Sequence, residues 1–257
     1  MKSSWLLFLL VLWAGGVSAA DLTGDEILTK SENAYAALKS YVGTTTVKSN
    51  AVINDMHIAQ TAMAKIVFSR PGKIRIEGKD TSGQAFTIVS DGKGTWSSWA
   101  IKNKGAFERS QSVEMAIAGM TGVAAGAPTQ IPAALMKLNW GYPFVRAKDS
   151  KLEGREKIRG ADCYRVVSKT PAGRTRYWVD SRNFLLRQMK EEQDENELAE
   201  LQRKVEEEAG KTLREQGIEM PKFAMKSRET LHSFAIEKIN VSIDPKLFQD
   251  PTKSKGR

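Results

Sequence analysis

The feature that most constrains the fold is an alternation of apolar and polar residues that recurs along most of the chain. Ala64, Ile66 and Phe68 alternate with mostly polar neighbours in one run, and Ile74 and Ile76 do so in the next. A period of two places apolar side chains on one face of a β-strand. The Pro-Gly pair between the runs is a turn signal, so the pattern predicts an antiparallel hairpin with one apolar face.

The same alternation predicts a mainly β (α+β) fold. Further strands are expected at 86–89, 95–99, 151–157, 163–169, 174–180, 185–191 and 230–242, with turn residues between most of them. One helix is expected near the start, because Thr23 and Glu26 have capping-box spacing and Leu28, Ser31, Tyr35 and Leu38 follow on one face. Such a sheet can close into a sandwich or curl into a half-barrel, and periodicity alone does not choose between them.

A secretion signal is expected at the N-terminus. Lys2 precedes an apolar run at 5–13, and small residues follow at 15–20. This order is typical of a cleaved signal peptide, and the run is shorter than the roughly 20 residues that a membrane-spanning helix needs. We expect residues 1–20 to be removed and residues 21–257 to form a single domain that is soluble outside the cytoplasm. A retained membrane anchor is the alternative.

Residues 115–135, the lid segment, differ in character from the strands. Ten of these 21 residues are Ala or Gly, and none is charged. One interpretation is a flexible loop with a short helix that begins near Pro132. The other is a movable apolar lid, because an uncharged segment must cover apolar surface or be covered by it.

An acidic helical arm is expected at 191–217, inserted between two strands. Leu198, Leu201, Val205, Ala209 and Leu213 form a narrow apolar stripe on a helix at 194–216. Between residues 191 and 216, ten acidic residues stand against four basic ones, whereas the whole chain has a net charge of +9. The stripe is expected to pack on the rest of the chain or on a second copy of the protein. A coiled-coil contact with a partner protein is the more specific hypothesis.

Several classes of function are disfavoured by composition. The only cysteine is Cys163 and the only histidines are His57 and His232, so neither a disulfide within the chain nor a usual zinc site is expected. Cys163 lies in mid-strand among apolar residues, which is typical of core, and both histidines are expected at the surface. No hydrolase or metalloprotease motif is present. We expect no enzyme activity, no metal, no cofactor and no nucleic-acid partner. Anionic lipid is a better match than nucleic acid for the positive charge of the chain outside the acidic arm.

Three short motifs occur along the chain, and their order is more informative than any one of them. Residues 68–77 read FSRPGKIRIE, residues 88–93 read IVSDGK with Trp96 after them, and residues 239–248 read INVSIDPKLF. In this order they resemble strands of the periplasmic outer-membrane lipoprotein-sorting, or lipoprotein-carrier, superfamily (LolA-like, with LolB-like and RseB-like relatives). The resemblance runs from residue 25 to residue 251 apart from the acidic arm. It implies an incomplete antiparallel β-barrel (half-barrel) with helices covering the concave face, which holds acyl chains.

The resemblance also implies a role for Arg70, as the arginine that ties the lid shut by hydrogen bonds and releases it when cargo enters. Arg70 has the parity of Ile66 and Phe68, so a regular strand would direct its guanidinium toward the apolar face. Its five donors would need carbonyl partners there, which the lid segment could supply. The alternative is that Arg70, beside a turn, extends to solvent.

The candidate lipid-binding residues share the inward parity or lie in or beside the lid segment. They are Ile66, Phe68, Ile74, Ile76, Phe86, Ile88, Trp96, Ile117, Met120, Val123, Leu135 and Met136. The implied function is a non-enzymatic carrier that binds acyl chains of lipoproteins or lipids and delivers them toward the outer membrane, between an inner-membrane donor and an outer-membrane acceptor. The alternative is an envelope-sensing module of the same fold that binds an anti-sigma factor.

Overall fold

The computed structural model describes residues 22–139, 141–144, 149–170, 173–200, 203, 207 and 225–253. The expected signal peptide at 1–20 lies outside these residues, as does most of the acidic arm.

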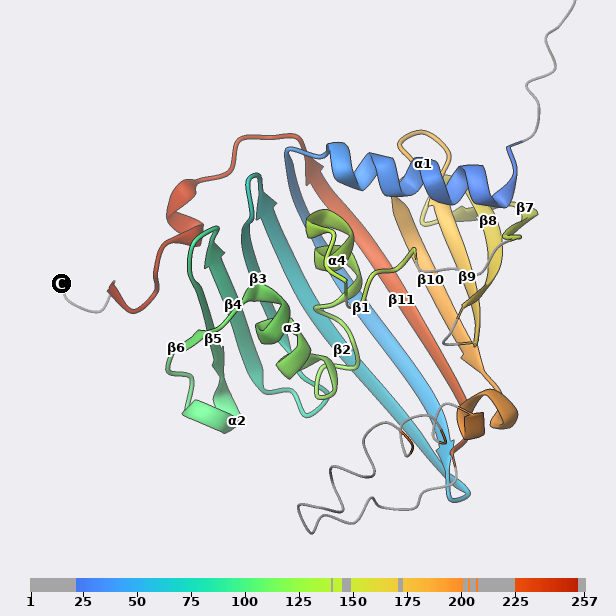
Figure 1. Cartoon of the computed structure of the whole chain (residues 1–257), viewed down its shortest axis with the longest axis horizontal. Coiled ribbons are helices and arrows are strands. Elements are labelled where there is room, and N and C mark those ends of the chain that lie inside the picture. Colours follow the sequence, from blue (N-terminus) through green and yellow to red (C-terminus); the bar gives the residue numbers. More distant parts are fainter. Residues whose placement is uncertain are drawn as a thin grey trace, which may run out of the picture.

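Eleven strands form one antiparallel sheet in the order β6-β5-β4-β3-β2-β1-β11-β10-β9-β8-β7 (Figure 1). The strands are β1 (Ser40–Ile53), β2 (Met56–Ser69), β3 (Lys73–Lys79), β4 (Ala85–Asp91), β5 (Thr95–Trp99), β6 (Glu108–Ser110), β7 (Lys151–Ile158), β8 (Ala161–Thr170), β9 (Gly173–Asp180), β10 (Leu186–Gln193) and β11 (Met225–Ile239). Each half of the sheet is a meander, and the halves join where the first strand pairs with the last. The sheet curls without closing, so the fold is an open half-barrel, as expected.

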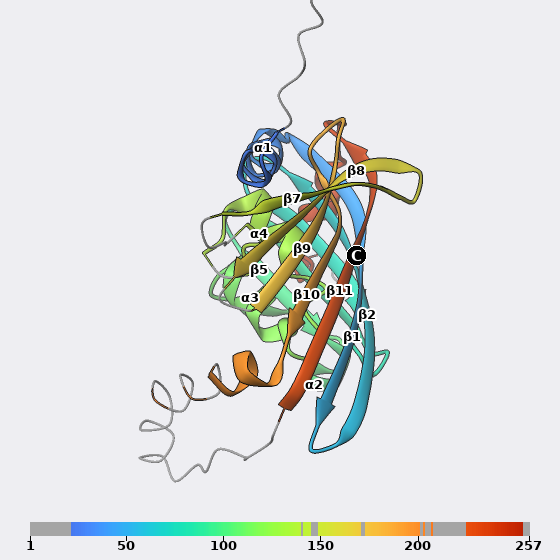
Figure 2. The same cartoon turned by 90° about the vertical axis from the view of Figure 1, so that its right-hand side faces the viewer.

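Helices cover one face of this sheet. They are α1 (Gly24–Ala37), α3 (Val113–Thr121) and α4 (Gln130–Met136), and the short α2 (Ala100–Asn103) directly continues β5. Figure 2 shows α1, α3 and α4 on the same, concave side of the strands. Helix α1 contacts β7, β8 and β9, whereas α3 contacts β4, β5 and β6. The expected arrangement of helices over the concave face is therefore confirmed.

Local sequence signals explain where α1 begins. The Thr23 hydroxyl accepts from the backbone N–H of Glu26 at 3.2 Å, and the Glu26 carboxylate accepts from the backbone N–H of Thr23 at 2.8 Å. This capping box satisfies donors that have no partner in the first helical turn. The predicted stripe of Leu28, Ser31 and Tyr35 is fully buried against the sheet.

The central hairpin of β1 and β2 is long and regular. Its register runs from the pair of Ser40 and Ser69 to the pair of Ile53 and Met56 without a shift. The two residues between the strands, Asn54 and Asp55, have positive φ values of 47° and 65°. Two such residues match the type I′ turn that joins twisted strands most directly. The far end of the hairpin extends beyond the helices, and Met56 there is exposed.

The opposite, convex face carries a smaller apolar cluster. Val89, Trp96 and Phe248 are buried there, and Phe248 belongs to the short 3-10 helix η1 (Pro245–Phe248), which contacts β3 and β4. Arg75 on this face donates to the carbonyl oxygen of Leu247. The C-terminal segment is therefore a strap fixed to the outside of the sheet.

Other differences from the sequence expectations concern short or irregular elements. Helix α2 and strand β6 were not predicted, because four- and three-residue elements carry no readable period. The lid segment contains two helices where one was expected. The last strand begins at Met225, five residues before its expected start, because its first residues pair with the exposed half of β1.

Candidate functional site

The concave face and the lid segment share one apolar core. Eleven of the twelve candidate lipid-binding residues belong to this core or pack against it: Ile66, Phe68, Ile74, Ile76, Phe86, Ile88, Ile117, Met120, Val123, Leu135 and Met136. The six from strands are at most 1% exposed. The interior is therefore closed by the lid segment in this structure.

Trp96 does not belong to this group, and the expectation that it lies on the concave face is wrong. It pairs with Val89, whose side chain points to the opposite face from Ile88. Trp96 is buried in the convex cluster beneath the C-terminal strap. The reason is the register of the turn at 91–94, which pairs Ile88 with Ser97 and so shifts the inward side chains to odd-numbered positions.

Small residues let the sheet and the lid segment approach closely. Ala124, Ala127 and Ala133 are completely buried. On the sheet, a Cβ atom on Gly78 would lie 2.6 Å from the Phe86 ring and still closer to the carbonyl oxygen of Met63, so there is no room for a side chain at this position. The bulk of the shared core is thus supplied by a few large residues, Ile117, Met120, Ile131 and Leu135 among those of the lid segment.

Arg70 joins three parts of the fold. Its Nε donates to the carbonyl oxygen of Leu38 at 2.7 Å, and its Nη2 donates to those of Tyr35 at 3.3 Å and Leu135 at 3.1 Å. All three carbonyls lie at C-terminal ends of helices, which attract positive charge, and that of Tyr35 also accepts from the backbone N–H of Leu38. The guanidinium also lies 5.3 Å from the centre of the Phe68 ring. Arg70 therefore points toward the helices, as its parity predicted, and contacts the lid segment directly.

Two other groups of hydrogen bonds hold the segment around α3 and α4. The backbone N–H of Thr81, in the turn between β3 and β4, donates to the carbonyl oxygen of Val123 at 2.9 Å. Tyr177 of β9 donates from its hydroxyl to the carbonyl oxygen of Pro143 at 2.8 Å, and Tyr142 donates to the carboxylate of Glu32 at 2.7 Å. The Thr81 bond thus ties the lid segment to the sheet. The two tyrosine bonds fix the stretch that follows α4, one to the sheet and one to α1, and apolar contact supplies the rest.

The turn that carries Thr81 is itself organised by Asp80. One Asp80 oxygen accepts from the backbone N–H groups of Ser82 and Gln84 and from the Ser82 hydroxyl, and the other accepts from the Trp99 indole at 2.8 Å. Burial alone would raise the pKa of the Asp80 carboxyl, but these hydrogen bonds outweigh burial and lower it. A charged Asp80 thereby positions one tether of the lid.

A row of polar side chains crosses the concave face below the apolar core. Register places Ser49, Thr230, Glu191, Thr175 and Ser168 opposite one another on five strands. The four hydroxyl residues are buried, and the hydroxyls of Ser49 and Thr230 lie 3.1 Å apart. Sequence reasoning missed this row because it follows the pairing between strands, which one strand's pattern does not contain.

His232 lies between the polar row and the apolar core, and its expected surface position is wrong. It is 2% exposed, stacks on Phe234 with ring centres 6.3 Å apart, and pairs with Val47 and Met189. The signal was present, since His232 has the inward parity of Phe234. His57 is exposed on the convex side of β2, as expected.

Charges beside His232 come from neighbouring strands. Its Nε2 lies 3.8 Å from a carboxylate oxygen of Glu191. Burial by itself would raise the pKa of Glu191, but the nearby His232 and Arg228 outweigh burial and lower the pKa below its ordinary value. Glu191 is therefore ionised at neutral pH inside the half-barrel.

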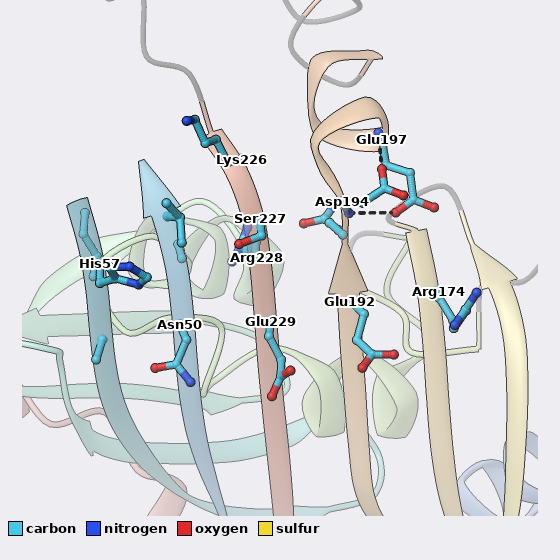
Figure 3. Close-up of a pocket in the computed structure, with 15 residues that line it drawn as sticks. Asn50, His57, Arg174, Glu192, Asp194, Glu197, Lys226, Ser227, Arg228 and Glu229 are labelled. Carbon is cyan, nitrogen blue, oxygen red and sulfur yellow. Dashed lines mark hydrogen bonds between the residues drawn. The ribbon is translucent and has the colours of Figure 1, made fainter. Parts of the chain in front are cut away.

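A separate groove of about 670 Å³ lies on the convex face at the far end of the sheet (Figure 3). Its walls mix opposite charges, with Arg174 and Lys226 near Glu192, Glu229 and the first turn of the acidic arm. Many of these charges already have partners: Lys190 bridges Glu192 and Glu229 at 2.7 and 2.9 Å, and Lys226 pairs with Asp55. None of the residues that line the groove belongs to the apolar core.

The start of the acidic arm is visible in the structure. Asp194 and Glu197 cap it reciprocally through backbone N–H groups, and residues 195–200 are helical. The strand before it continues through Gln193, two residues beyond the expected end at 191. Leu198 of the predicted stripe is buried, whereas Leu201, Val205, Ala209 and Leu213 lie outside the described residues.

Cys163 is completely buried in β8, and burial raises the pKa of its thiol to about 11. No cluster of three or more potential metal ligands occurs among the described residues. In the same part of the chain, no helix combines the length and hydropathy that a membrane crossing requires.

No family model matches the sequence, and no curated protein matches it either. Solved structures with a similar arrangement include LprF from Mycobacterium bovis (12% identity, 89% of this chain and 96% of that chain, TM-score 0.46) and the lipoprotein LppX from Mycobacterium tuberculosis (11%, 85% and 95%, TM-score 0.43). A LolA superfamily protein from Nitrosomonas europaea is similar over 90% of this chain and 99% of its own (12%, TM-score 0.33).

At these identities and TM-scores the likeness concerns the course of the chain alone, and nothing about a ligand follows from it. The architecture itself is seen directly: an open antiparallel sheet, helices on its concave face, and Arg70 against both α1 and α4. The chain has the half-barrel fold that its sequence resemblance to the LolA-like superfamily implied.

Proposed function

We propose that this protein is a non-enzymatic periplasmic carrier that binds acyl chains of lipoproteins or lipids between the concave face and the lid segment. The observation that supports this most is the composition of the interface between them. Large apolar side chains of the sheet meet an uncharged segment that is fixed by a few hydrogen bonds, those of Arg70 and Thr81 among them.

Exchange of apolar partners makes such binding energetically feasible. When the lid segment moves aside, the core residues Ile66, Ile74 and Ile88 lose contact with Ile117, Met120 and Leu135. An acyl chain that enters the same space covers these residues again and is itself removed from water, which contributes about 0.8 kcal/mol per CH₂ group. The remaining cost is the loss of the tethering hydrogen bonds, about 0.5–1.5 kcal/mol for each neutral one. A long acyl chain outweighs a few such bonds.

Arg70 has the geometry of a latch in this scheme. Its bond to Leu135 fixes the lid, whereas its bonds to Tyr35 and Leu38 keep it on α1. Release of the Leu135 carbonyl alone would free α4 while leaving Arg70 and α1 in place. In our proposal cargo passes from an inner-membrane donor to an outer-membrane acceptor, with the lid closed between the two encounters.

A titration with a fluorescent fatty acid tests the binding step. We expect saturable binding with a blue-shifted emission, because the probe enters an apolar interior, and competition by unlabelled long-chain lipids. Replacement of Met120 by Glu would place a charge among the contacts the chain needs, and should abolish binding, whereas Met115→Glu on the exposed side of α3 should not. A wild-type protein that leaves the probe unaffected would contradict the proposal.

A further inference from the structure

The interior of the half-barrel is amphipathic along the strand direction. Toward α1, the inward side chains are mostly apolar and include Phe68 and Phe234. Toward the far end of the sheet the row of Ser49, Thr230, Glu191, Thr175 and Ser168 follows. A wholly apolar ligand would fill only the first part. A ligand with an apolar chain and a polar end matches both.

Two buried polar side chains, His232 next to the polar row and Thr45 one level nearer α1, have no hydrogen-bond partners among the described residues. Neither ring nitrogen of His232 makes a hydrogen bond, and neither does the Thr45 hydroxyl, which is completely buried. Thr45 pairs with Phe234 and is thus a diagonal neighbour of His232 on the same face. Buried polar groups are normally paired, and leaving one unpaired costs about 1–3 kcal/mol. These groups provide donors and acceptors for a ligand.

The lid segment lies over His232. A Cβ atom on Gly126 would lie 3.6 Å from Cε1 of His232, so the turn between α3 and α4 contacts the imidazole edge. Gly126 has a φ of +78°, which glycine adopts without strain. Movement of the lid would therefore expose His232 together with the apolar core, and a ligand entering under the lid would reach both.

We infer that the concavity holds an acyl chain joined to an uncharged head group that both donates and accepts hydrogen bonds, and that His232, Thr45 and Glu191 bind this head group. This inference rests on the proposed binding of acyl chains. An ester or amide carbonyl can accept from His232 or Thr45, and a hydroxyl or amide N–H can donate to Glu191. Acylated glycerols and acylated peptides share this chemistry.

Charge argues against a free fatty acid as the preferred ligand. Its carboxylate would lie in a partly buried site beside the ionised carboxylate of Glu191, and like charges at short range in a low dielectric repel strongly. The groups that could offset this repulsion are His232 and Arg228, and both already interact with Glu191. An uncharged head group avoids the repulsion and still uses every polar atom of the site.

Isothermal titration with three ligands of one chain length tests the inference: monopalmitoylglycerol, an N-palmitoylated tripeptide amide and palmitate. We expect wild-type protein to bind at least one of the two uncharged ligands about tenfold more tightly than palmitate at pH 7. The stronger of the two identifies the source of the head group, glycerol ester or acylated peptide.

Three variants assign the preference to the site. His232→Leu and the near-isosteric Thr45→Val should each weaken the uncharged ligand about three- to tenfold, the value of one hydrogen bond, and weaken palmitate by less. Glu191→Gln should tighten palmitate. His57→Leu, an exposed histidine on the convex face, is the matched control and should change nothing. Thermal unfolding verifies that each variant is folded, and Thr45→Val serves if His232→Leu is not.

The outcomes separate this inference from the proposed function. Equal affinity of wild-type protein for palmitate and both uncharged ligands, or a preference that survives in folded His232→Leu and Thr45→Val, would overturn the head-group site while acyl-chain binding stands. Failure of all three ligands to bind wild-type protein would overturn the proposed function, and the head-group site with it.

Discussion

Arg70 donates a hydrogen bond from Nη2 to the carbonyl oxygen of Leu135 across 3.1 Å, and this bond connects the end of β2 to the lid segment. The same nitrogen also donates to Tyr35 of α1. One side chain therefore holds the C-terminal ends of two helices against the sheet. Any motion that separates α4 from the concave face must break its bond to Leu135.

Replacement of Arg70 by Leu should loosen the lid without unfolding the protein. We expect faster hydrogen exchange of the backbone amides in α4 and release of a bound fluorescent fatty acid about tenfold faster, because hydrogen bonds from a charged donor are worth about 1.5–3 kcal/mol and this one is partly exposed. Arg75→Leu is the matched control, since Arg75 holds the C-terminal strap on the convex face. Identical release rates for both variants would remove the latch role.

The C-terminal strap should stabilise the fold without affecting the ligand. Phe248 is 2% exposed against β3 and β4, so Phe248→Ala should lower the free energy of unfolding by about 3–5 kcal/mol, the usual cost of removing a buried aromatic ring. Leu247→Ala at the neighbouring, 40% exposed position should cost less than about 1 kcal/mol. Chemical denaturation measures both. An equal effect of the two variants would contradict the anchoring role of Phe248.

Asp80 should give a pH-dependent contribution to stability. Because its pKa is lower in the folded protein than the ordinary value of 3.8, the contribution is present above that value and is lost as the pH falls through the lower, folded-state pKa. Asp80→Asn replaces one acceptor oxygen by an amide that cannot accept from Trp99, and should cost about 1–2 kcal/mol at pH 7.

Unfolding temperatures between pH 2 and pH 7 measure this effect. The difference between wild type and Asp80→Asn should shrink as the pH falls below about 4. Asp162→Asn, at an exposed position, should follow the wild-type curve. A difference between wild type and Asp80→Asn that stays constant down to pH 2 would show that the charge of Asp80 is not responsible.

Cys163 should be unreactive in the folded protein. A buried thiol with a pKa of about 11 is almost wholly protonated at pH 8, and the thiolate is the reactive form. A chromogenic disulfide reagent should therefore modify it only after unfolding in denaturant. Rapid, stoichiometric modification of native protein would contradict the assignment of Cys163 to the core.

The strands and the direction of Arg70 could be predicted because both depend on short-range parity. The turn at 70–72 pairs Ile66 with Ile76, so the inward side chains have even residue numbers on both sides of the turn. The turn at 91–94 pairs Ile88 with Ser97, which reverses the parity and explains why Trp96 was misplaced. A single residue in a turn decides such a reversal, and the amino-acid pattern of the strands does not reveal it.

The polar row and the place of His232 required the long-range register. Val47 and His232 are neighbours only because the first strand pairs with the last. Ser49, Glu191 and Ser168 come from three distant stretches of the sequence. Within its own stretch, each has the pattern of an ordinary polar residue of a strand. Their common level on the concave face follows from strand pairing, which is a property of the whole sheet.

The most direct test of acyl-chain binding is mass spectrometry of lipids extracted from protein purified from its native compartment without detergent. The account predicts an acylated lipid or lipoprotein in near-stoichiometric amount, depleted in the Met120→Glu variant and retained in Met115→Glu. Wild-type protein that consistently carries no acylated molecule, and takes none up from lipid vesicles, would contradict it.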